Sequence, residues 1–569
     1  MKIKKGLKLR IVLGIIIAVA LIIAIAGYFI LFNSSNSKAS YPIDSIVLTT
    51  VDRTIVTVPV PPSSPIINPT EIAKYAEYGY GKWTFGKGKP YEKRLDLMPD
   101  SYNDTNIKNK AKLLNFFAMT DIHLVDKESP AQGIYFGYIK RSISAYSGIM
   151  LYTTHVLDSV IQTVNALNKK EPFDFGIFLG DNINSAQYNE IRWFIDVLDG
   201  KEINPDSGIK DDPIPGPHND YQDKFQSAGL DKSIKWYQVI GNHDHFWTGI
   251  YPPTDYIKDT YVGENIIQLG NIFTPEGIYE RSLYMGTFNG STIYGDIIGM
   301  GPANKTVPIT IAADSNRHYI SSIELASEFF NTSSNPIGHG FNKADVNKGF
   351  LCYSFEPKSN IPFKVIVLDD TQKDNDPSTN IHGHSYLDTE RYEWLVNELE
   401  QGQNEGKLMI IALHVPIGLN NSNPEMSWDT DSPITEEELI AKLHSYPNLI
   451  LLTAGHRHLN TVTVFKSPDM DYPELGFWQV ETSSLREFSQ EFRTFKIVRN
   501  SDNTLSIFIT NVDPAVKEGS FAAISRSYAI AANQIFNINF TEPYNAELVV
   551  PLSPEMQDKI QNYGTLLNN

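Results

Sequence analysis

The chain has 569 residues, of which 41% are hydrophobic and 11% aromatic, and its formal net charge is −18. A chain of this size and composition can bury a large core as one elaborated domain or two domains. The acidic balance argues against a nucleic acid partner, because a negative surface repels polyanions over long range.

The N-terminus combines a basic flank with a long apolar run. Residues 1–10 contain five Lys or Arg and no acidic residue, and the 22 residues of 11–32 carry no charge. At 1.5 Å per residue, such a run forms a helix of about 33 Å, enough to cross a hydrocarbon core of about 30 Å. We expect a transmembrane anchor at 11–32, with the flank 1–10 in the cytoplasm and the rest of the chain outside.

A cleaved signal peptide is the alternative for this segment. Ser37-Lys38-Ala39 fits a small-x-small cleavage site loosely, but the apolar run exceeds the usual 7–15 residues of a signal peptide. If the segment is an uncleaved anchor, residues 33–40 form a short tether between it and the rest of the chain. Cys352 is the only cysteine, so no intrachain disulfide can stabilise an exported domain.

The segment 41–110 is rich in Pro, Gly and Tyr, and we expect it to wrap over the main domain, which spans 111–512. In that domain, apolar runs of strand length alternate with amphipathic helical stretches, a pattern typical of an α/β layered fold. The predicted strands are 113–119, 173–179, 236–240, 363–368, 409–413, 449–453, 461–465, 477–481, 494–498 and 505–510. The predicted helices are 152–169, 191–198, 387–399 and one that begins near Thr435, where Thr435 and Glu438 form a capping-box pattern.

Two segments lie outside this regular pattern. Residues 246–350 form a Gly-, Asn- and Tyr-rich insertion, and residues 513–569 extend beyond the last predicted strand. Long insertions beside an active site commonly set specificity. Four residues of the insertion and the residue just before it are candidates for a pocket, although ordinary loop packing would explain each of them: His245, Phe246, Trp247, His339 and Asn342. The strand 363–368 is expected to belong to the same sheet as the other strands, and Asp369-Asp370 after it is expected to be a turn.

Five short motifs directly follow predicted strands. They are Asp121-Ile-His123, Gly180-Asp181-Asn182, Gly241-Asn242-His243-Asp244, His414 and Gly455-His456-Arg-His458. Each motif alone is weak, but the carboxyl ends of strands in an open α/β sheet converge on one rim. A mixture of oxygen ligands and imidazoles suits Mn, Fe or Zn better than Ca. The sequence therefore predicts a site for two divalent metal ions.

The ordered set of motifs resembles the calcineurin-like metallophosphoesterase superfamily over about residues 113–512. The resemblance implies an αββα-type sandwich flanked by helices. It also implies one ion held by Asp121, His123, Asp181 and His458, and a second held by Asp181, Asn242, His414 and His456, with Asp181 as the bridge. His243 would stabilise charge or protonate the leaving oxygen, and Asp244 would orient His243.

The sequence differs from two subfamilies of this superfamily at known motif positions. The protein Ser/Thr phosphatases of this superfamily carry Asp-Arg-Gly after the Gly-Asp motif, where this chain has Asn182-Ile183-Asn184-Ser185. Purple acid phosphatases have a tyrosine at the position of Asn184, so a ferric tyrosinate centre is not expected. The stretch 121–132 resembles a poorly characterised prokaryotic branch with long N- and C-terminal additions. Its Asp126, Lys127 and Glu128 would line the mouth of the site or face solvent.

The functional hypothesis is a membrane-anchored, externally facing phosphoesterase. Two cations can lower the pKa of a shared water, and the resulting bridging hydroxide would attack a phosphomonoester or phosphodiester. A pyrophosphatase or phospholipid-headgroup hydrolase would use the same residues. A metal-stabilised binding protein without turnover is the hypothesis from another class. The complete donor set together with His243 favours the enzyme.

Overall fold

The computed structural model describes residues 47–567 except 141–147, 209–213, 215–218, 273, 275, 377–380 and 420–427. The expected membrane anchor at 11–32, its basic flank and its tether lie outside the described residues. Among the helices that are described, none is both long enough and apolar enough to cross a membrane.

The larger of the two main sheets has eight strands, in the order β3-β20-β19-β18-β4-β5-β8 with β21 paired to β4. The strands β4, β5 and β8 are parallel to one another, whereas β18 and β19 run antiparallel to their neighbours. The strands are β3 (Glu92–Arg94), β4 (Asn109–Met119), β5 (Phe175–Phe178), β8 (Trp236–Gln238), β18 (Phe492–Asn500), β19 (Leu505–Val512), β20 (Ala546–Val550) and β21 (Thr565–Leu566).

The second main sheet has six strands, in the order β12-β13-β14-β15-β17-β16. Its four central strands are parallel, and the two edge strands β12 and β16 are antiparallel. The strands are β12 (Tyr353–Phe355), β13 (Phe363–Val367), β14 (Leu408–Ala412), β15 (Leu449–Ala454), β16 (Val462–Phe465) and β17 (Phe477–Glu481).

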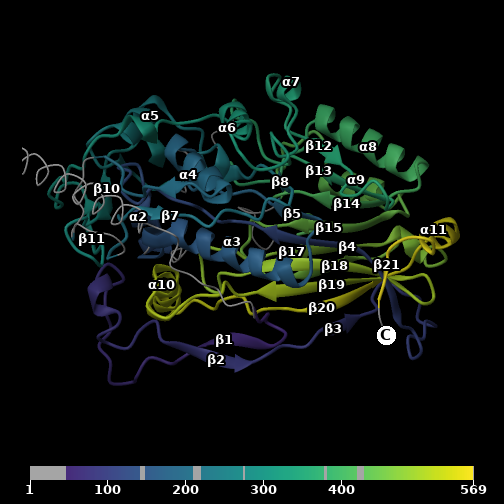
Figure 1. Cartoon of the computed structure of the whole chain (residues 1–569). Helices are drawn as coiled ribbons and strands as arrows, with labels where there is room; N and C mark the ends of the chain where they lie inside the picture. Colours follow the sequence, from purple (N-terminus) through teal and green to yellow (C-terminus); the bar gives the residue numbers. More distant parts are fainter. Residues whose placement is uncertain are drawn as a thin grey trace, which may run out of the picture.

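The two sheets pack face to face with helices on their outer faces (Figure 1). Alternate residues of β13 show this layering, since Val365 belongs to the core between the sheets and Ile366 to the core beneath the helices α8 (Thr389–Asn404) and α9 (Glu436–Leu443). Such period-two alternation is expected of a strand with both faces buried. The helices α3 (Thr153–Lys170) and α4 (Tyr188–Asp199) join the same apolar cluster as the eight-stranded sheet.

The remaining elements surround this sandwich. The insertion 246–350 contains a three-stranded sheet at one end of the molecule and short helices that extend from there along the top of the view (Figure 1). Its elements are α5 (Asp255–Val262), β9 (Gln268–Leu269), β10 (Leu283–Phe288), β11 (Ile297–Pro302), α6 (Ser322–Glu328) and α7 (Lys343–Val346). Elsewhere lie β1 (Arg53–Thr57), β2 (Trp83–Lys87), α2 (Ile134–Lys140), β6 (Glu202–Ile203), β7 (Phe225–Gln226), α10 (Phe521–Phe536) and α11 (Pro554–Ile560).

The predicted strands and helices all have counterparts within a few residues, and Thr435 with Glu438 forms the expected capping box at the start of α9. The grouping of the strands differs from the prediction. Residues 363–368 were expected in the same sheet as the strands before the first three motifs, yet β13 lies in the other sheet. The eight-stranded sheet also continues past residue 512, because β20 in the C-terminal extension pairs with β19, and β3 of the N-terminal segment pairs with β20.

Candidate metal centre

The five motifs come together at one end of the sandwich, although they leave two different sheets. The loops after β4, β5 and β8 carry the first three motifs, and the loops after β14 and β15 carry His414 and the two histidines of 455–458. The carboxyl ends of these parallel strands meet, as expected. The loops that follow them come from both sheets rather than from a single sheet.

One cluster of donor atoms contains Asp121, His123 and His458. His458 Nε2 lies 3.2 Å from Asp121 Oδ1 and 3.1 Å from His123 Nε2. His123 Nε2 is 3.7 Å from Asp121 Oδ1 and 3.8 Å from Asp181 Oδ2. Ligands about 2.1 Å from a shared ion lie roughly 3.0–3.4 Å apart at octahedral or tetrahedral angles. The two contacts of His458 lie in this range, and the two contacts of His123 with the carboxylates are slightly longer.

A second cluster contains Asp181, His414 and His456, with Asn242 beside them. His414 Nε2 lies 2.9 Å from Asn242 Oδ1, 3.3 Å from His456 Nδ1 and 3.4 Å from Asp181 Oδ1. The two carboxylate oxygens of Asp181 thus face different clusters, Oδ1 toward His414 and Oδ2 toward His123. This is the arrangement required of a bridging carboxylate.

The electrostatics of both clusters favour bound cations. Asp121 and Asp181 are buried, and in the described part of the chain their ion-pair partners are imidazoles rather than Lys or Arg. Burial lowers the pKa of His414, but the carboxylates of Asp181, Asp121 and Asp370 outweigh it and raise that pKa to about 10. For His456, burial prevails and lowers the pKa to about 3, which keeps the ring in the neutral, ligating form. The residues present therefore fit two divalent ions.

Backbone conformation at the centre is unusual. Asp121, His123, Asp181, His456 and His458 all have positive φ, between 44° and 71°. Non-glycine residues rarely adopt this left-handed region, and such strain clusters at functional sites. All five positions lie in the loops that follow β4, β5 and β15, so the unusual conformations coincide with the segments that carry the candidate ligands.

His243 lies beside the first cluster but is held by a different group than expected. Its ring is 4.4 Å from that of His123, centroid to centroid, and its Nδ1 is 2.7 Å from the backbone oxygen of Asn184. A carbonyl only accepts, so Nδ1 carries the proton and Nε2 remains for the site. Burial lowers the pKa of His243 to about 3.

Asp244 does not orient His243, contrary to the expectation. Both of its oxygens accept backbone N–H groups, from Gly241 (2.9 Å) in its own loop and from Asp181 (3.0 Å), Asn182 (2.9 Å) and Ile183 (3.3 Å) in the neighbouring loop. Asp244 therefore ties together two of the loops that carry ligands. The prediction was wrong because the spacing in the motif does not reveal that the side chain turns toward the adjacent loop.

Other buried groups at the centre were missed or undervalued in the sequence. Asp370, expected to be a turn residue, accepts the backbone N–H of His414 (3.1 Å). Glu190 accepts the N–H groups of Asn184 (3.2 Å) and Ser185 (2.9 Å), which places the carbonyl that holds His243. The strand-end rule that found the motifs also applies to β17, and would have drawn attention to residues 482–487 beyond it.

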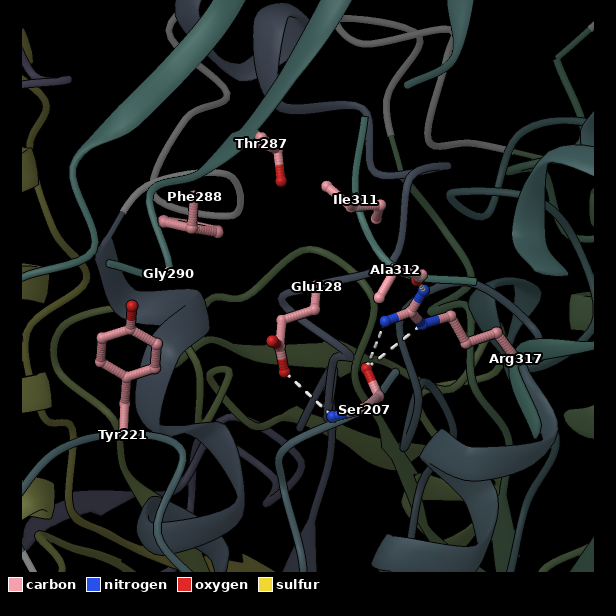
Figure 2. A pocket seen from close by; sticks show the side chains of 9 residues that line it. All are labelled: Glu128, Ser207, Tyr221, Thr287, Phe288, Gly290, Ile311, Ala312 and Arg317. Carbon is pink, nitrogen blue, oxygen red and sulfur yellow. Dashed lines mark hydrogen bonds between the residues drawn. The ribbon is translucent and has the colours of Figure 1, made fainter. Parts of the chain in front are cut away.

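The loop after the first motif is buried rather than open to solvent. Asp126 pairs with Arg317 of the insertion, Nε to Oδ2 at 3.0 Å, and Lys127 pairs with Glu128 at 3.0 Å. Figure 2 shows Glu128 and Arg317 on either side of Ser207, whose N–H donates to Glu128 and whose hydroxyl accepts from Arg317. These three residues line a pocket with Tyr221, Thr287, Phe288, Gly290, Ile311 and Ala312.

The suggested pocket residues in and just before the insertion are mostly buried. His245, Phe246, Trp247 and His339 are buried. Asn342 is exposed and caps α7, where its side chain accepts the N–H of Ala344. Ordinary packing thus accounts for these residues.

Comparisons with known proteins give little help. No family model matches the sequence, and no curated protein matches it. Among solved structures, the chain is similar to a dimetal phosphatase from Danio rerio, with 11% identity, a TM-score of 0.37, and coverage of 71% of this chain and 100% of that one. At this degree of similarity, function has to be inferred from the site itself.

The role of Asp244 can be tested by Asp244→Asn. The amide places an NH₂ group against backbone N–H donors, so we expect the metal-free protein to lose about 1–3 kcal/mol of stability. Chemical denaturation measures the change, with the exposed Asp558→Asn as the matched control. A variant as stable as the unsubstituted protein would contradict the proposed linkage of the two loops.

Proposed function

We propose that this protein is a metal-dependent phosphoesterase that uses two divalent ions of Mn, Fe or Zn. The proposal is carried by the convergence of six donor side chains on the two sides of a seventh, the carboxylate of Asp181. One ion would be held by Asp121, His123, Asp181 and His458, and the other by Asp181, Asn242, His414 and His456. Bound ions of this kind lower the pKa of a water and polarise a phosphoryl oxygen.

The chain's own residues have distinct roles in this proposal. Asn242 contributes a neutral oxygen, which adds a donor without cancelling positive charge that the phosphate must meet. His243, with Nδ1 donating to the backbone oxygen of Asn184, leaves Nε2 on the side of His123 and Asp181, where it would take up a proton during the reaction and pass it to the leaving oxygen. A binding protein would not need this additional imidazole, so turnover is favoured. Phosphomonoesters and phosphodiesters are the proposed substrates, and pyrophosphate and phospholipid headgroups are the alternatives.

We also propose that the chain is anchored in the cell membrane by residues 11–32, with the catalytic domain outside. The proposal rests on the length of the uncharged run and on the basic residues before it. The formal charge of the chain beyond residue 10 is −23, from 43 basic and 66 acidic residues. That charge suits a small ester better than a nucleic acid.

The metal site is tested by Asp181→Asn in the full-length protein. Since one carboxylate serves both clusters, the variant is expected to lose most bound metal and nearly all hydrolysis. Metal content is measured by elemental analysis, and activity with Mn, Fe or Zn on chromogenic mono- and diesters, nucleotides, pyrophosphate and lipid headgroups. Full turnover by the variant would show that the site is elsewhere.

His243 is tested by His243→Asn. We expect kcat to fall by roughly 10²–10⁴, the usual contribution of a general acid or base, while metal content stays near that of the unsubstituted protein. The exposed His318→Asn serves as the control for loss of an imidazole. Loss of both metals along with activity would assign His243 as a ligand instead.

Membrane topology is tested with protease added to intact cells. An outward-facing domain is expected to be degraded while a cytoplasmic marker survives, and the full-length chain is expected in the membrane fraction. Recovery of a soluble form that begins near Tyr41 would support signal-peptide cleavage and contradict the anchor.

A further inference from the structure

The segment between β17 and β18 borders the candidate metal centre. Because β17 is parallel to β15, this segment leaves the same end of the sheet as the loop of His456 and His458. Ser484 Oγ donates to the backbone oxygen of Asp121 (2.6 Å), and Glu487 reaches His458. The segment thus touches two members of the first cluster.

The two ring nitrogens of His458 face different carboxylates, one on each side of the ring. Nε2 points into the cluster, 3.2 Å from Asp121 Oδ1, whereas Nδ1 lies 3.3 Å from Glu487 Oε1. By contrast, the outer nitrogen of His414 meets a neutral group, the backbone oxygen of Leu179, at 2.8 Å. Glu487 therefore brings a full negative charge to the outer side of a candidate ligand.

His458 is also the most exposed member of its cluster. The exposed fraction of its side chain is 21%, compared with 3% for His123 and 0% for Asp121. Packing holds the two buried side chains, but it holds the ring of His458 less firmly. The contact of Nδ1 with Glu487 is consequently an additional constraint on the orientation of this ring.

Glu487 is itself held in place by its neighbours. The backbone N–H of Arg486 donates to Ser484 Oγ (3.0 Å), and the side-chain amide of Gln490 donates to the backbone oxygen of Arg486 (3.3 Å). The Arg486 side chain is buried and donates to Asn184 Oδ1. The residues on both sides of Glu487 are thus anchored to the body of the protein.

We propose that Glu487 is a positioning residue for His458 and tunes the affinity of the ion held by Asp121, His123 and His458. Its carboxylate accepts the Nδ1–H of His458, which fixes the tautomer with the lone pair on Nε2 and increases the basicity of the ring. Carboxylate partners of this kind commonly change metal affinity by about 10–100-fold. The inference rests on the metal site of the proposed function but not on its phosphoesterase activity.

The test is Mn²⁺ titration of the chelator-stripped, full-length protein by calorimetry, with Glu487→Gln and Glu487→Ala compared. Gln keeps an acceptor but loses the charge, and Ala loses both. We expect the Mn²⁺ affinity of one site to fall about 10-fold or more in Glu487→Gln and further in Glu487→Ala. The Mn²⁺ affinity of the other site is expected to change less than about threefold. Exposed Glu518→Gln is the matched control and is expected to bind like the unsubstituted protein.

A purely structural role is distinguished by the melting temperature of the metal-free protein. Positioning predicts that this temperature is unchanged in Glu487→Gln while the stabilisation by Mn²⁺ is reduced. Unchanged Mn²⁺ affinities in both variants, or equal weakening of both sites with a lower metal-free melting temperature, would overturn the proposal. Two Mn²⁺ ions bound with the expected Glu487 effect but no ester hydrolysis would refute only the proposed function.

Discussion

The burial of two carboxylates among imidazoles is the constraint on which the site depends. Asp121 and Asp181 lie at the end of the sandwich with almost no exposure to water. A buried ionised carboxylate is costly unless hydrogen bonds and positive charge compensate it. The backbone N–H of His456 at Asp121 (2.8 Å) and that of His243 at Asp181 (2.8 Å) supply part of this compensation. Divalent cations would supply the remainder, and their binding would then be coupled to folding in this region.

The candidate metal centre is built from loops of both sheets, because the motifs are divided between them. Candidate ligands from the eight-stranded sheet meet those from the six-stranded sheet, and two hydrogen bonds already join the two sides: the N–H of His456 to Asp121 (2.8 Å) and Nδ1 of His414 to the backbone oxygen of Leu179 (2.8 Å). Asp244 ties the loops after β5 and β8 to each other, and Asp370 fixes the loop after β14. The hydrogen bonds of these carboxylates hold each loop to its own sheet. Bound ions would then cross-link the sheets.

Much of this architecture could be predicted because strand periodicity and strand-end residues are local properties of a sequence. Runs such as 409–413 and 449–453 identify buried strands, and the polar residue after each run identifies the functional end. Partner choice between strands is not local, so the assignment of each strand to one of the two sheets and the return of β20 to the first sheet could not be anticipated. The same limit explains Asp244, whose four partners include three from a loop about 60 residues away in the chain. Glu487 was missed, although the same search for polar residues after a strand, applied to β17, would have included it.

The left-handed backbone conformations at the centre affect which substitutions would accumulate if the activity were no longer under selection. Each non-glycine residue in this region costs on the order of 1–3 kcal/mol, and five of the candidate ligands adopt it. Their sum rivals the roughly 5–15 kcal/mol by which a typical domain is stable. Glycine at any of these five positions would relieve backbone strain while removing a donor. Once selection on activity ends, drift in this lineage would therefore run toward more stable, inert copies, and glycines at 121, 123, 181, 456 or 458 would mark them.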